Sequence, residues 1–342
     1  MYYVGLDVHW SMSVVHILDG NGKRVKSQTV RGPWSKVIEV LREFEGPMAV
    51  CYEASCGYGY LYEQLRKVAQ SVVVAHPGEL RLIFRSKKKN DRVDASKLAK
   101  LLYLDQVPVV HVPSAAVRSW RSMIEFRQRL VGKQTRVKNG LRALLRTNGI
   151  THAAGTKLWT QKGLAWLAQV EFSTSLDTVQ RDMKLDELAL LQSQIKRVEH
   201  ELKDFADHHP AVWLLRTIPG VGIRTAEAMV AYIDDAKRFS NNKKIGSYFG
   251  LVPSEDTSVK RRLGRITQQG PGTVRRLLAE AAWQGYRRSP HIRAYMERIQ
   301  KGDRDRKKIA LVATAHYLAR VMLSMLRTGE CWRFDRPAQE AA

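Results

Sequence analysis

The sequence predicts a mixed α/β N-terminal part followed by a mostly helical remainder. In the first hundred residues short β-rich runs alternate with helical ones, and from residue 117 onward apolar residues recur at helical spacing. The composition is globular, with 44% hydrophobic and 26% charged residues, and 342 residues are enough for roughly two or three domains. A disordered chain is therefore excluded.

Three antiparallel strands are expected to open the chain. Residues 2–8, 13–18 and 25–30 are rich in β-forming side chains, and the Asp-Gly-Asn-Gly segment at 19–22 is a strong hairpin signal. A regular alternation follows. It comprises an amphipathic helix at 34–44, a strand at 48–52, a helix at 58–69 and a strand at 72–75. Together these runs predict a mixed sheet covered by helices.

The remainder is predicted to be helical. A long helix with a basic face is expected over 117–145. A heptad seam follows, with steps of three and four, at Leu188, Leu191, Ile195, Val198, Leu202 and Phe205. A seam of this length fits either a short coiled coil between chains or an ordinary helical hairpin, and both remain open.

Four segments are expected along the chain. They are a first domain with its basic helix (1–150), a helical or coiled-coil linker (151–210), a helical C-terminal domain (211–330) and a polar tail (331–342). The three cysteines form no C-x-x-C pair, which predicts reduced, inert thiols. No run of about 18 apolar residues is present, so an intracellular protein without a membrane partner is expected.

Positive charge is concentrated in two places. The formal net charge is +24; segment 118–146 carries nine Lys and Arg against one acid, and segment 257–308 carries fifteen against four. Two dense runs favour binding of a phosphate backbone over a merely solvated surface.

Four acids of the first domain predict a metal site. Asp7 lies within an apolar β-like run, and Glu53 follows the next such run. Asp91 and Asp94 share one face at the start of a helical pattern. Carboxylates gathered in this way repel one another unless a cation lies between them, and hard divalent ions prefer oxygen ligands.

Two segments of the second half add features that bind phosphate. The turn at 217–222 contains Gly220 and Gly222 and resembles a helix-hairpin-helix element, which grips the backbone without reading sequence. The loop at 250–267 is rich in hydroxyls and cations. Spacing does not separate its hydroxyls Ser254, Thr257 and Ser258, and without further information a phosphate-contacting loop is favoured over a catalytic serine.

Taken together, these motifs resemble the DEDD transposases of insertion sequences, the IS-one-ten family, which includes Piv-like DNA invertases. The resemblance covers nearly the whole chain. In the first half it rests on Gly5-Leu6-Asp7, Tyr52-Glu53-Ala54 and Lys89-Asn90-Asp91-Arg92-Val93-Asp94-Ala95. In the second half it rests on Ile218-Pro-Gly-Val-Gly, Gly250-Leu-Val-Pro253, the Arg262–Gly270 run and Val274-Arg275-Arg276-Leu277-Leu278.

The resemblance implies an RNase H-like first domain of the Holliday-junction-resolvase type. It also implies a catalytic set of Asp7, Glu53, Asp91 and Asp94, holding two Mg²⁺ ions, with Ser258 as the DNA nucleophile. Further implications are a phosphoserine intermediate, a guide (bridge) RNA that pairs with donor and target DNA, and a homo-oligomer, dimer or tetramer. The setting would be the prokaryotic cytoplasm, close to the nucleoid. The heptad seam at 188–205 is one candidate for joining protomers.

The residues expected to bind nucleic acid come from both halves of the chain. They are Gly220, Gly222, Arg118, Arg121, Lys133, Arg136, Lys260, Arg261, Arg262, Arg265, Arg275 and Arg276. Two alternatives remain for the whole chain. One is a metal-dependent hydrolytic nuclease of the Holliday-junction type, in which water replaces the serine, and the other is a non-catalytic nucleic-acid-binding protein.

Overall fold

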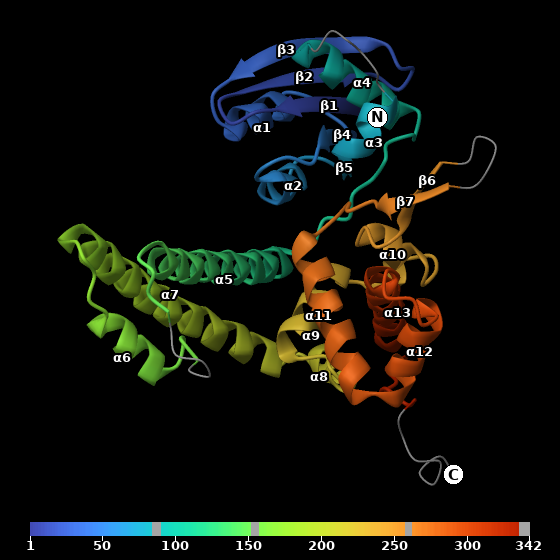
Figure 1. Ribbon diagram of the computed structural model, residues 1–342. Helices are drawn as coiled ribbons and strands as arrows, with labels where there is room; N and C mark the ends of the chain where they lie inside the picture. Colours follow the sequence, from blue (N-terminus) through green and yellow to red (C-terminus); the bar gives the residue numbers. More distant parts are fainter. Residues whose placement is uncertain (84–89, 152–156, 257–261, 335–342) are drawn as a thin grey trace. The chain divides into compact units, whose positions relative to one another are not determined.

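A computed structural model describes residues 1–83, 90–151, 157–256 and 262–334 (Figure 1). The chain divides into two compact units, Met1–Arg118 and Ser119–Ala342. The first contains a five-stranded sheet with helices, and the second is mostly helical. The predicted combination of a mixed α/β part with a helical part is confirmed.

The sheet of the first unit has the strand order β3-β2-β1-β4-β5. Its strands are β1 (Tyr2–Val8), β2 (Met12–Leu18), β3 (Arg24–Arg31), β4 (Met48–Glu53) and β5 (Ser71–Ala75). The first three pair antiparallel, whereas β4 runs parallel to β1 and β5 parallel to β4. The predicted hairpin turn is present, because Asp19 Oδ1 accepts hydrogen bonds from the backbone N–H of Asn21 and of Lys23, each at 2.9 Å.

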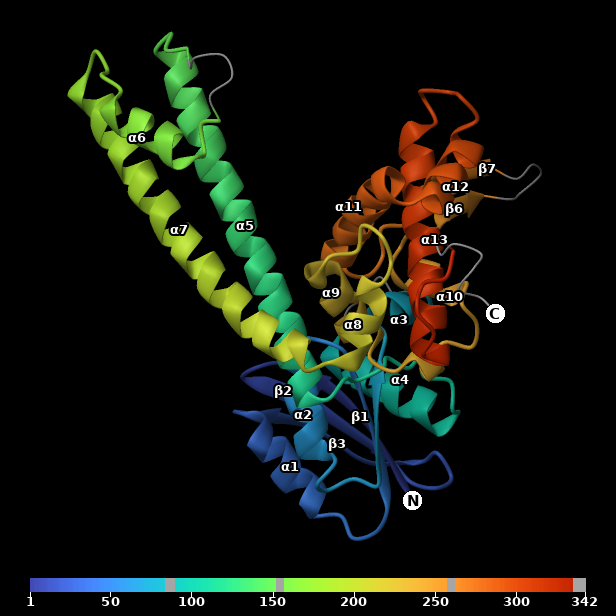
Figure 2. The same ribbon diagram turned by 90° about the horizontal axis from the view of Figure 1, so that it is seen from below.

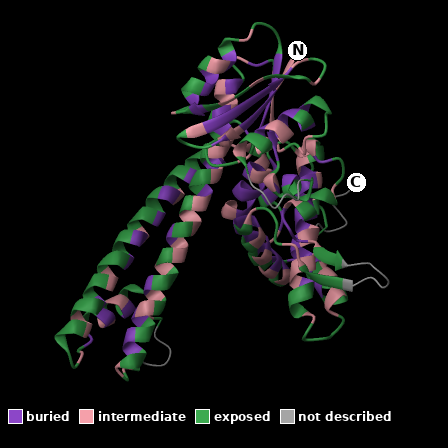
Figure 3. Ribbon diagram, turned by 90° about the horizontal axis from the view of Figure 1, so that it is seen from above, coloured by how far each residue is buried: buried purple, intermediate pink, exposed green. Residues whose placement is uncertain are grey.

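Helices cover both faces of this sheet. They are α1 (Trp34–Arg42), α2 (Tyr58–Leu65), α3 (Pro77–Ile83) and α4 (Asp91–Tyr103). Buried side chains of α1 and α2 share a core with Val4, Leu6 and Tyr52, whereas Leu98 and Leu101 of α4 share one with Cys51 on the opposite face. Strands β1, β2 and β4 are mostly buried, as expected for strands covered on both sides, whereas the edge strand β3 is mostly exposed (Figure 3).

The second unit consists of helices and one short hairpin. The helices are α5 (Ala115–Thr147, which begins in the first unit), α6 (Gln161–Gln169), α7 (Ser175–Asp207), α8 (Pro210–Arg216), α9 (Ile223–Ile233), α10 (Lys244–Tyr248), α11 (Gly272–Arg288), α12 (Pro290–Gln300) and α13 (Lys307–Thr328). The strands β6 (Pro253–Asp256) and β7 (Arg262–Ile266) pair antiparallel. The sequence predicted a loop over 250–267, and the antiparallel pairing of β6 with β7 corrects this prediction.

The heptad seam lies inside a helical hairpin formed by α5 and α7, which lie side by side (Figures 1 and 2). Leu188, Leu191 and Ile195 are buried in one core with Ile124 and Val137 of α5. This arrangement decides between the two readings of the seam in favour of the hairpin. The seam residues from Leu188 to Leu202 thus pack within the chain, whereas Phe205 is 47% exposed.

Helix α13 is the one described helix that is long and apolar enough to cross a membrane. Its buried residues include Leu318, Met322 and Leu323, which belong to the core of the second unit. A core helix passes the same test of length and composition. Beyond α13, Trp332 is also buried in this core, although it falls within the segment expected to be a polar tail.

Candidate metal centre

The alternation of strand residues places Asp7 and Glu53 on the same face of the sheet. Register pairs Leu6 of β1 with Tyr52 of β4, so Asp7 and Glu53 occupy the next position on two parallel neighbours. Leu6 and Tyr52 point into the core under α1 and α2. Because successive side chains point to opposite faces, both acids point to the face covered by α4.

Helix α4 brings the other two acids to that face. The side chain of Asn90 caps the helix by accepting a hydrogen bond from the N–H of Arg92 at 3.0 Å, and Asp91 and Asp94 lie in the first turn. The helix packs against Gly5, where an added Cβ would lie 2.1 Å from the carbonyl oxygen of Ala95. A glycine at this position is therefore needed for α4 to approach the strand that carries Asp7.

A histidine that the sequence analysis did not single out completes the group. His9 Nε2 lies 3.7 Å from Asp7 Oδ1 and 4.0 Å from Asp91 Oδ2. One ligand atom from each of Asp7, His9 and Asp91 can be chosen so that all lie within 4.8 Å of one another. The available signal was the spacing of two residues from Asp7, which places both side chains on one side of an extended chain.

The connection after His9 is closed by the backbone. The His9 N–H donates to the Met12 carbonyl oxygen at 3.0 Å, and the Gly32 N–H donates to the Ser11 carbonyl oxygen at 2.8 Å. In addition, Trp34 Nε1 donates to the His9 carbonyl oxygen at 2.9 Å. Hydrogen bonds with Met12 at the start of β2, with Gly32 after β3 and with Trp34 of α1 thus hold the turn next to the acids.

The electrostatics of the group centre on Asp7. Burial raises the pKa of the Asp7 carboxyl above its ordinary value; His9 opposes this rise, and the negative charges of Asp91, Asp94 and Glu53 add to it. All four predicted acids are therefore close enough to interact. Asp94 is also paired with Lys97 Nζ at 3.4 Å, and Glu53 is exposed.

This donor set fits a divalent cation. Carboxylate oxygens are the ligands of hard ions such as Mg²⁺, and a bound cation would offset the repulsion that raises the pKa of Asp7. The imidazole of His9 is also a ligand for transition metals, so the site is compatible with Mn²⁺ as well. Such a site can hold and polarise a phosphate oxygen.

The glycine turn of the second unit joins α8 to α9. Gly220 has a φ of +90°, and a Cβ there would lie 2.4 Å from the backbone nitrogen of Gly285 in α11. Gly222 is the N-cap residue of α9, with open space where its Cβ would be. Packing accounts for Gly220, whereas Gly222 leaves the start of α9 accessible.

The basic residues predicted on α5 divide into two pairs. Arg118 pairs with Glu63 and donates to the Pro113 carbonyl oxygen at 2.6 Å. Arg121 donates to the carbonyl oxygens of Ala231 and Tyr232 at 2.8 and 3.2 Å. Both are thus occupied by structural contacts. Lys133 and Arg136 are exposed on the same helix.

The C-terminal basic residues also differ in their contacts. Arg275 donates to the carbonyl oxygens of Phe249 and Gly270, each at 3.1 Å, which fixes the end of the β7 segment. Arg276 is exposed and contacts Gln128. These contacts give Arg275 a structural role and leave Arg276 at the surface.

The hairpin of β6 and β7 carries the proposed nucleophile region. Ser254 Oγ donates to the Arg265 carbonyl oxygen at 3.1 Å, and Arg265 itself is exposed on β7. Thr257, Ser258, Lys260 and Arg261 lie outside the described residues, and Arg262 is described only as the first residue of β7.

Comparison with known proteins identifies the family. The profile of the DEDD transposases of the IS110 (IS-one-ten) type matches residues 4–149, and that of the transposase IS116/IS110/IS902 family matches residues 213–297. The chain belongs to the IS110 family of DEDD transposases. An IS110-family transposase is a DNA-acting enzyme of an insertion sequence, and membership implies dependence on a divalent metal.

Relatives of this IS110-family transposase cover most of its length. It is 25% identical over 336 residues to the "Probable family 20 transposase" of Pseudomonas aeruginosa, covering 96% of this chain and 98% of the relative. It is 26% identical over 265 residues to the transposase for insertion sequence element IS1111A of Coxiella burnetii, covering 73% and 71%. It is 27% identical over 257 residues to the transposase for IS1328 of Yersinia enterocolitica, covering 74% and 72%.

Proposed function

We propose that this IS110-family transposase cuts and rejoins DNA strands at a Mg²⁺ site formed by Asp7, Glu53, Asp91 and Asp94. The supporting observation is that ligand atoms of Asp7, His9 and Asp91 lie within 4.8 Å of one another. Asp94 lies in the same first turn of α4 as Asp91, and Glu53 lies on the strand that runs parallel to that of Asp7. Two ions are expected, because a pair can stabilise the attacking and the leaving oxygen of an in-line displacement.

Each half of the chain has a separate task in this proposal. The acids orient the scissile phosphate, and His9 lies beside Asp7 and Asp91. Ser258 Oγ attacks phosphorus, a new Ser–O–P bond forms, and the bond to one strand's sugar oxygen breaks, with that oxygen leaving as a hydroxyl. The phosphoserine conserves the bond energy, so attack by another strand's hydroxyl rejoins DNA and restores the serine.

We assign the first unit to the RNase H-like class, supported by its strand order and by three antiparallel strands followed by two parallel ones. The functional segments proposed are 1–150, 151–210, 211–330 and 331–342. The exposed cations Lys133, Arg136, Arg265 and Arg276 are proposed to contact phosphates. A guide RNA would select donor and target DNA by base pairing, and the active form would be a dimer or tetramer.

The decisive experiment is a search for a covalent protein–DNA adduct. The transposase is incubated with its RNA, Mg²⁺ and labelled donor DNA, denatured, and examined for label that remains with the protein. The adduct is expected in the wild type and in Glu43→Gln, an exposed carboxylate of the same unit. It is expected to disappear in Asp7→Asn and in Ser258→Ala.

Further variants test which hydroxyl of the 250–267 segment is the nucleophile. Thr257→Ala and Ser254→Ala are expected to retain the adduct, because neither supplies the proposed nucleophile. Normal cutting and rejoining by Ser258→Ala would show that Ser258 is not the nucleophile. Free ends without any adduct would favour the hydrolytic nuclease, and binding without cleavage under any metal would favour a non-catalytic protein.

A further inference from the structure

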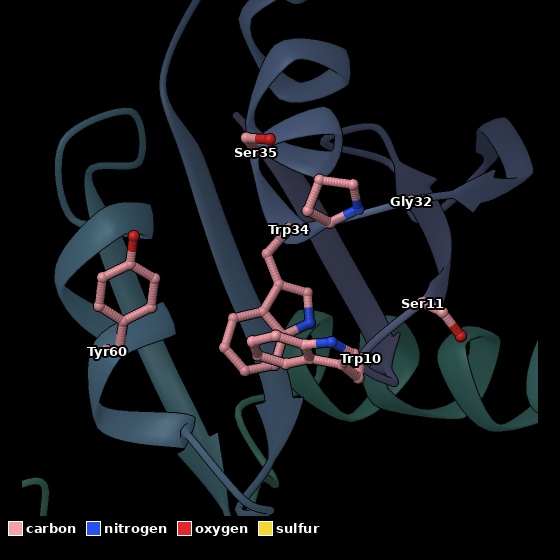
Figure 4. Close-up of a pocket in the computed structure, with 7 residues that line it drawn as sticks. Trp10, Ser11, Gly32, Trp34, Ser35 and Tyr60 are labelled. Carbon is pink, nitrogen blue, oxygen red and sulfur yellow. The ribbon is translucent and has the colours of Figure 1, made fainter.

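An aromatic pocket of about 440 Å³ opens in the first unit (Figure 4). Its main walls are Trp10, Trp34 and Tyr60, with Gly32 on the backbone side. Trp10 directly follows His9, and Trp34 is hydrogen-bonded to the His9 carbonyl oxygen. His9 therefore links the pocket and the acid cluster, because its carbonyl oxygen accepts a hydrogen bond from a wall of the pocket and its ring lies beside Asp7 and Asp91.

The tryptophans have different surroundings. Trp34 is 9% exposed, and its ring lies against Gly57, where a Cβ would be 2.7 Å from the Trp34 ring. Trp10 is 83% exposed and meets Trp34 edge to face, with ring centroids 5.7 Å apart. Trp34 is thus a fixed wall, and Trp10 presents a large aromatic surface to solvent.

Tyr60 completes the opposite side of the pocket. It is 59% exposed and nearly parallel to Trp34, with centroids 6.4 Å apart and an interplanar angle of 29°. Figure 4 shows the Tyr60 ring across from the two indoles. Three aromatic rings are thus grouped at the surface, and two of them are more than half exposed. Exposed apolar groups of this kind mark surfaces that bind a ligand or a partner.

A cation lies at the rim of the same pocket. The Lys36 side chain runs over Gly32, where a Cβ would be 3.0 Å from Lys36 Cδ and 3.4 Å from its Nζ. Exposed Arg31 precedes Gly32 in the chain. An aromatic surface with neighbouring cations matches a nucleotide, whose base stacks on rings and whose phosphate pairs with positive charge.

We propose that this pocket receives an unpaired base of the DNA strand whose phosphate lies at the acid cluster. The inference rests on the proposed function, because that function supplies the strand. A base stacks on Trp10 through its π-face, which does not discriminate strongly between sequences. A base within a duplex cannot reach such a pocket without leaving its stack, so the pocket selects a locally opened strand.

The test measures base stacking without cleavage. The full-length Asp7→Asn protein, which lacks one of the proposed ligands, is titrated into short oligothymidylate containing one 2-aminopurine, without divalent metal. Three oligonucleotides are compared: this DNA, a fully abasic DNA of the same length whose binding is followed through an end label, and the matching oligouridylate RNA. Salt is raised stepwise, because backbone contacts weaken with salt whereas stacking persists.

The variants are Trp10→Ala, Trp10→Phe and, as control, Val109→Ala, which removes an exposed apolar side chain of the same unit outside the pocket. Trp10→Ala is expected to weaken binding of the base-containing DNA roughly tenfold and to reduce quenching of 2-aminopurine. Trp10→Phe should restore most of both, and Val109→Ala should match the parent. Because the Trp10 side chain is exposed, its truncation should leave the fold intact, and circular dichroism checks this.

Three results would overturn the proposal. They are unchanged affinity and quenching in Trp10→Ala, an equal loss of affinity on the fully abasic strand, and a Trp10-dependent affinity that is greater for RNA than for DNA. Because no cleavage is measured, failure of the cutting reaction and failure of the pocket are distinguishable. If the transposase does not cut DNA but Trp10→Ala still weakens binding of the base-containing DNA, the proposed pocket stands and the proposed catalytic mechanism is wrong.

Discussion

The carbonyl oxygen of Ala95 lies 2.1 Å from the point that a Cβ on Gly5 would occupy. The same point is 2.4 Å from the backbone nitrogen of Ala99. Two backbone atoms of α4 thus occupy the volume of any side chain at this position of β1. Since Asp7 lies two residues further along β1, and Asp91 and Asp94 open α4, this contact sets how closely the acids meet.

Gly5→Ala should separate α4 from the sheet. Backbone atoms cannot turn aside as a side chain can, so we expect a loss of about 3 kcal/mol or more in the free energy of unfolding. Denaturant unfolding followed by circular dichroism measures it. Gly20→Ala is the matched control, because its Cβ would meet only the Met1 carbonyl oxygen at 3.8 Å. Equal stability of the two variants would show that α4 is not held by this contact.

Mg²⁺ should stabilise the first unit through Asp7. A ligand that binds only the folded state raises its stability by an amount that grows with concentration, reaching about 2.7 kcal/mol at one hundred times the Kd. We expect the thermal midpoint of the wild type to rise with Mg²⁺ and that of Asp7→Asn to stay constant. Glu43→Gln should behave as wild type. A rise in Asp7→Asn equal to that of the wild type would place the ion elsewhere.

His9→Ala should distinguish a ligand from a counter-charge. If the imidazole coordinates the ion, its loss weakens Mn²⁺ more than Mg²⁺, because imidazole favours the transition metal. We expect a several-fold larger increase of the Kd for Mn²⁺, measured by titration calorimetry. Equal changes for the two ions would indicate that His9 acts only through its charge.

Glu227 of α9 should make the second unit less stable as pH rises. Its carboxyl is 1% exposed, and burial raises its pKa to about 8, although Arg224 opposes this with a contact at 2.9 Å. The folded state then keeps a proton that the unfolded state releases near pH 4.5. Between these values the folded state binds more protons, so the free energy of unfolding falls with pH, by up to about 5 kcal/mol at 1.36 kcal/mol per pKa unit.

Glu227→Gln removes this titration. The variant should gain stability relative to the wild type as pH rises from about 5 to 8.5, as measured by denaturant unfolding at several pH values. Glu43→Gln, an exposed carboxylate, should run parallel to the wild type. A difference between Glu227→Gln and wild type that is constant with pH would mean that Glu227 is ionised throughout.

Leu188→Ala should destabilise the helical hairpin without changing the size of the assembly. Leu188 is 1% exposed in the α5–α7 core, and truncating such a leucine costs about 2–5 kcal/mol. Leu190→Ala, at a position that is 58% exposed, should change stability by less than about 0.5 kcal/mol. Light scattering should give both variants the wild-type mass. Dissociation caused by Leu188→Ala alone would return the seam to an interface between chains.

Local patterns predicted the strands of the first unit well. The first strand was predicted with its observed ends, Tyr2–Val8, because alternation and the Asp-Gly-Asn-Gly turn are both short-range signals. The shared face of Asp7 and Glu53 required the parallel register of β1 and β4, which depends on contacts between distant segments. Periodicity carries no such information.

The remaining differences have similar causes. His9 and the pocket of Trp10 and Trp34 depend on a turn and a helix coming together, so no single motif marked them. Arg118 and Arg121 have carbonyl and carboxylate partners within the fold, which charge counts along the sequence do not reveal. Helix α2 ends at Leu65 instead of Ala69, which reflects the weak sequence control over helix ends.

The short connection between β1 and β2 has a consequence for the accuracy of the reaction. The His9 N–H donates to Met12, and the carbonyl oxygens of His9 and Ser11 accept from Trp34 and Gly32. These hydrogen bonds on either side of Trp10 hold its backbone at a set distance from Asp7. A DNA strand bound both by Trp10 and by the acids would be held at two points that are a set distance apart. The position of a cut along that strand would then be counted from a base, whatever its identity.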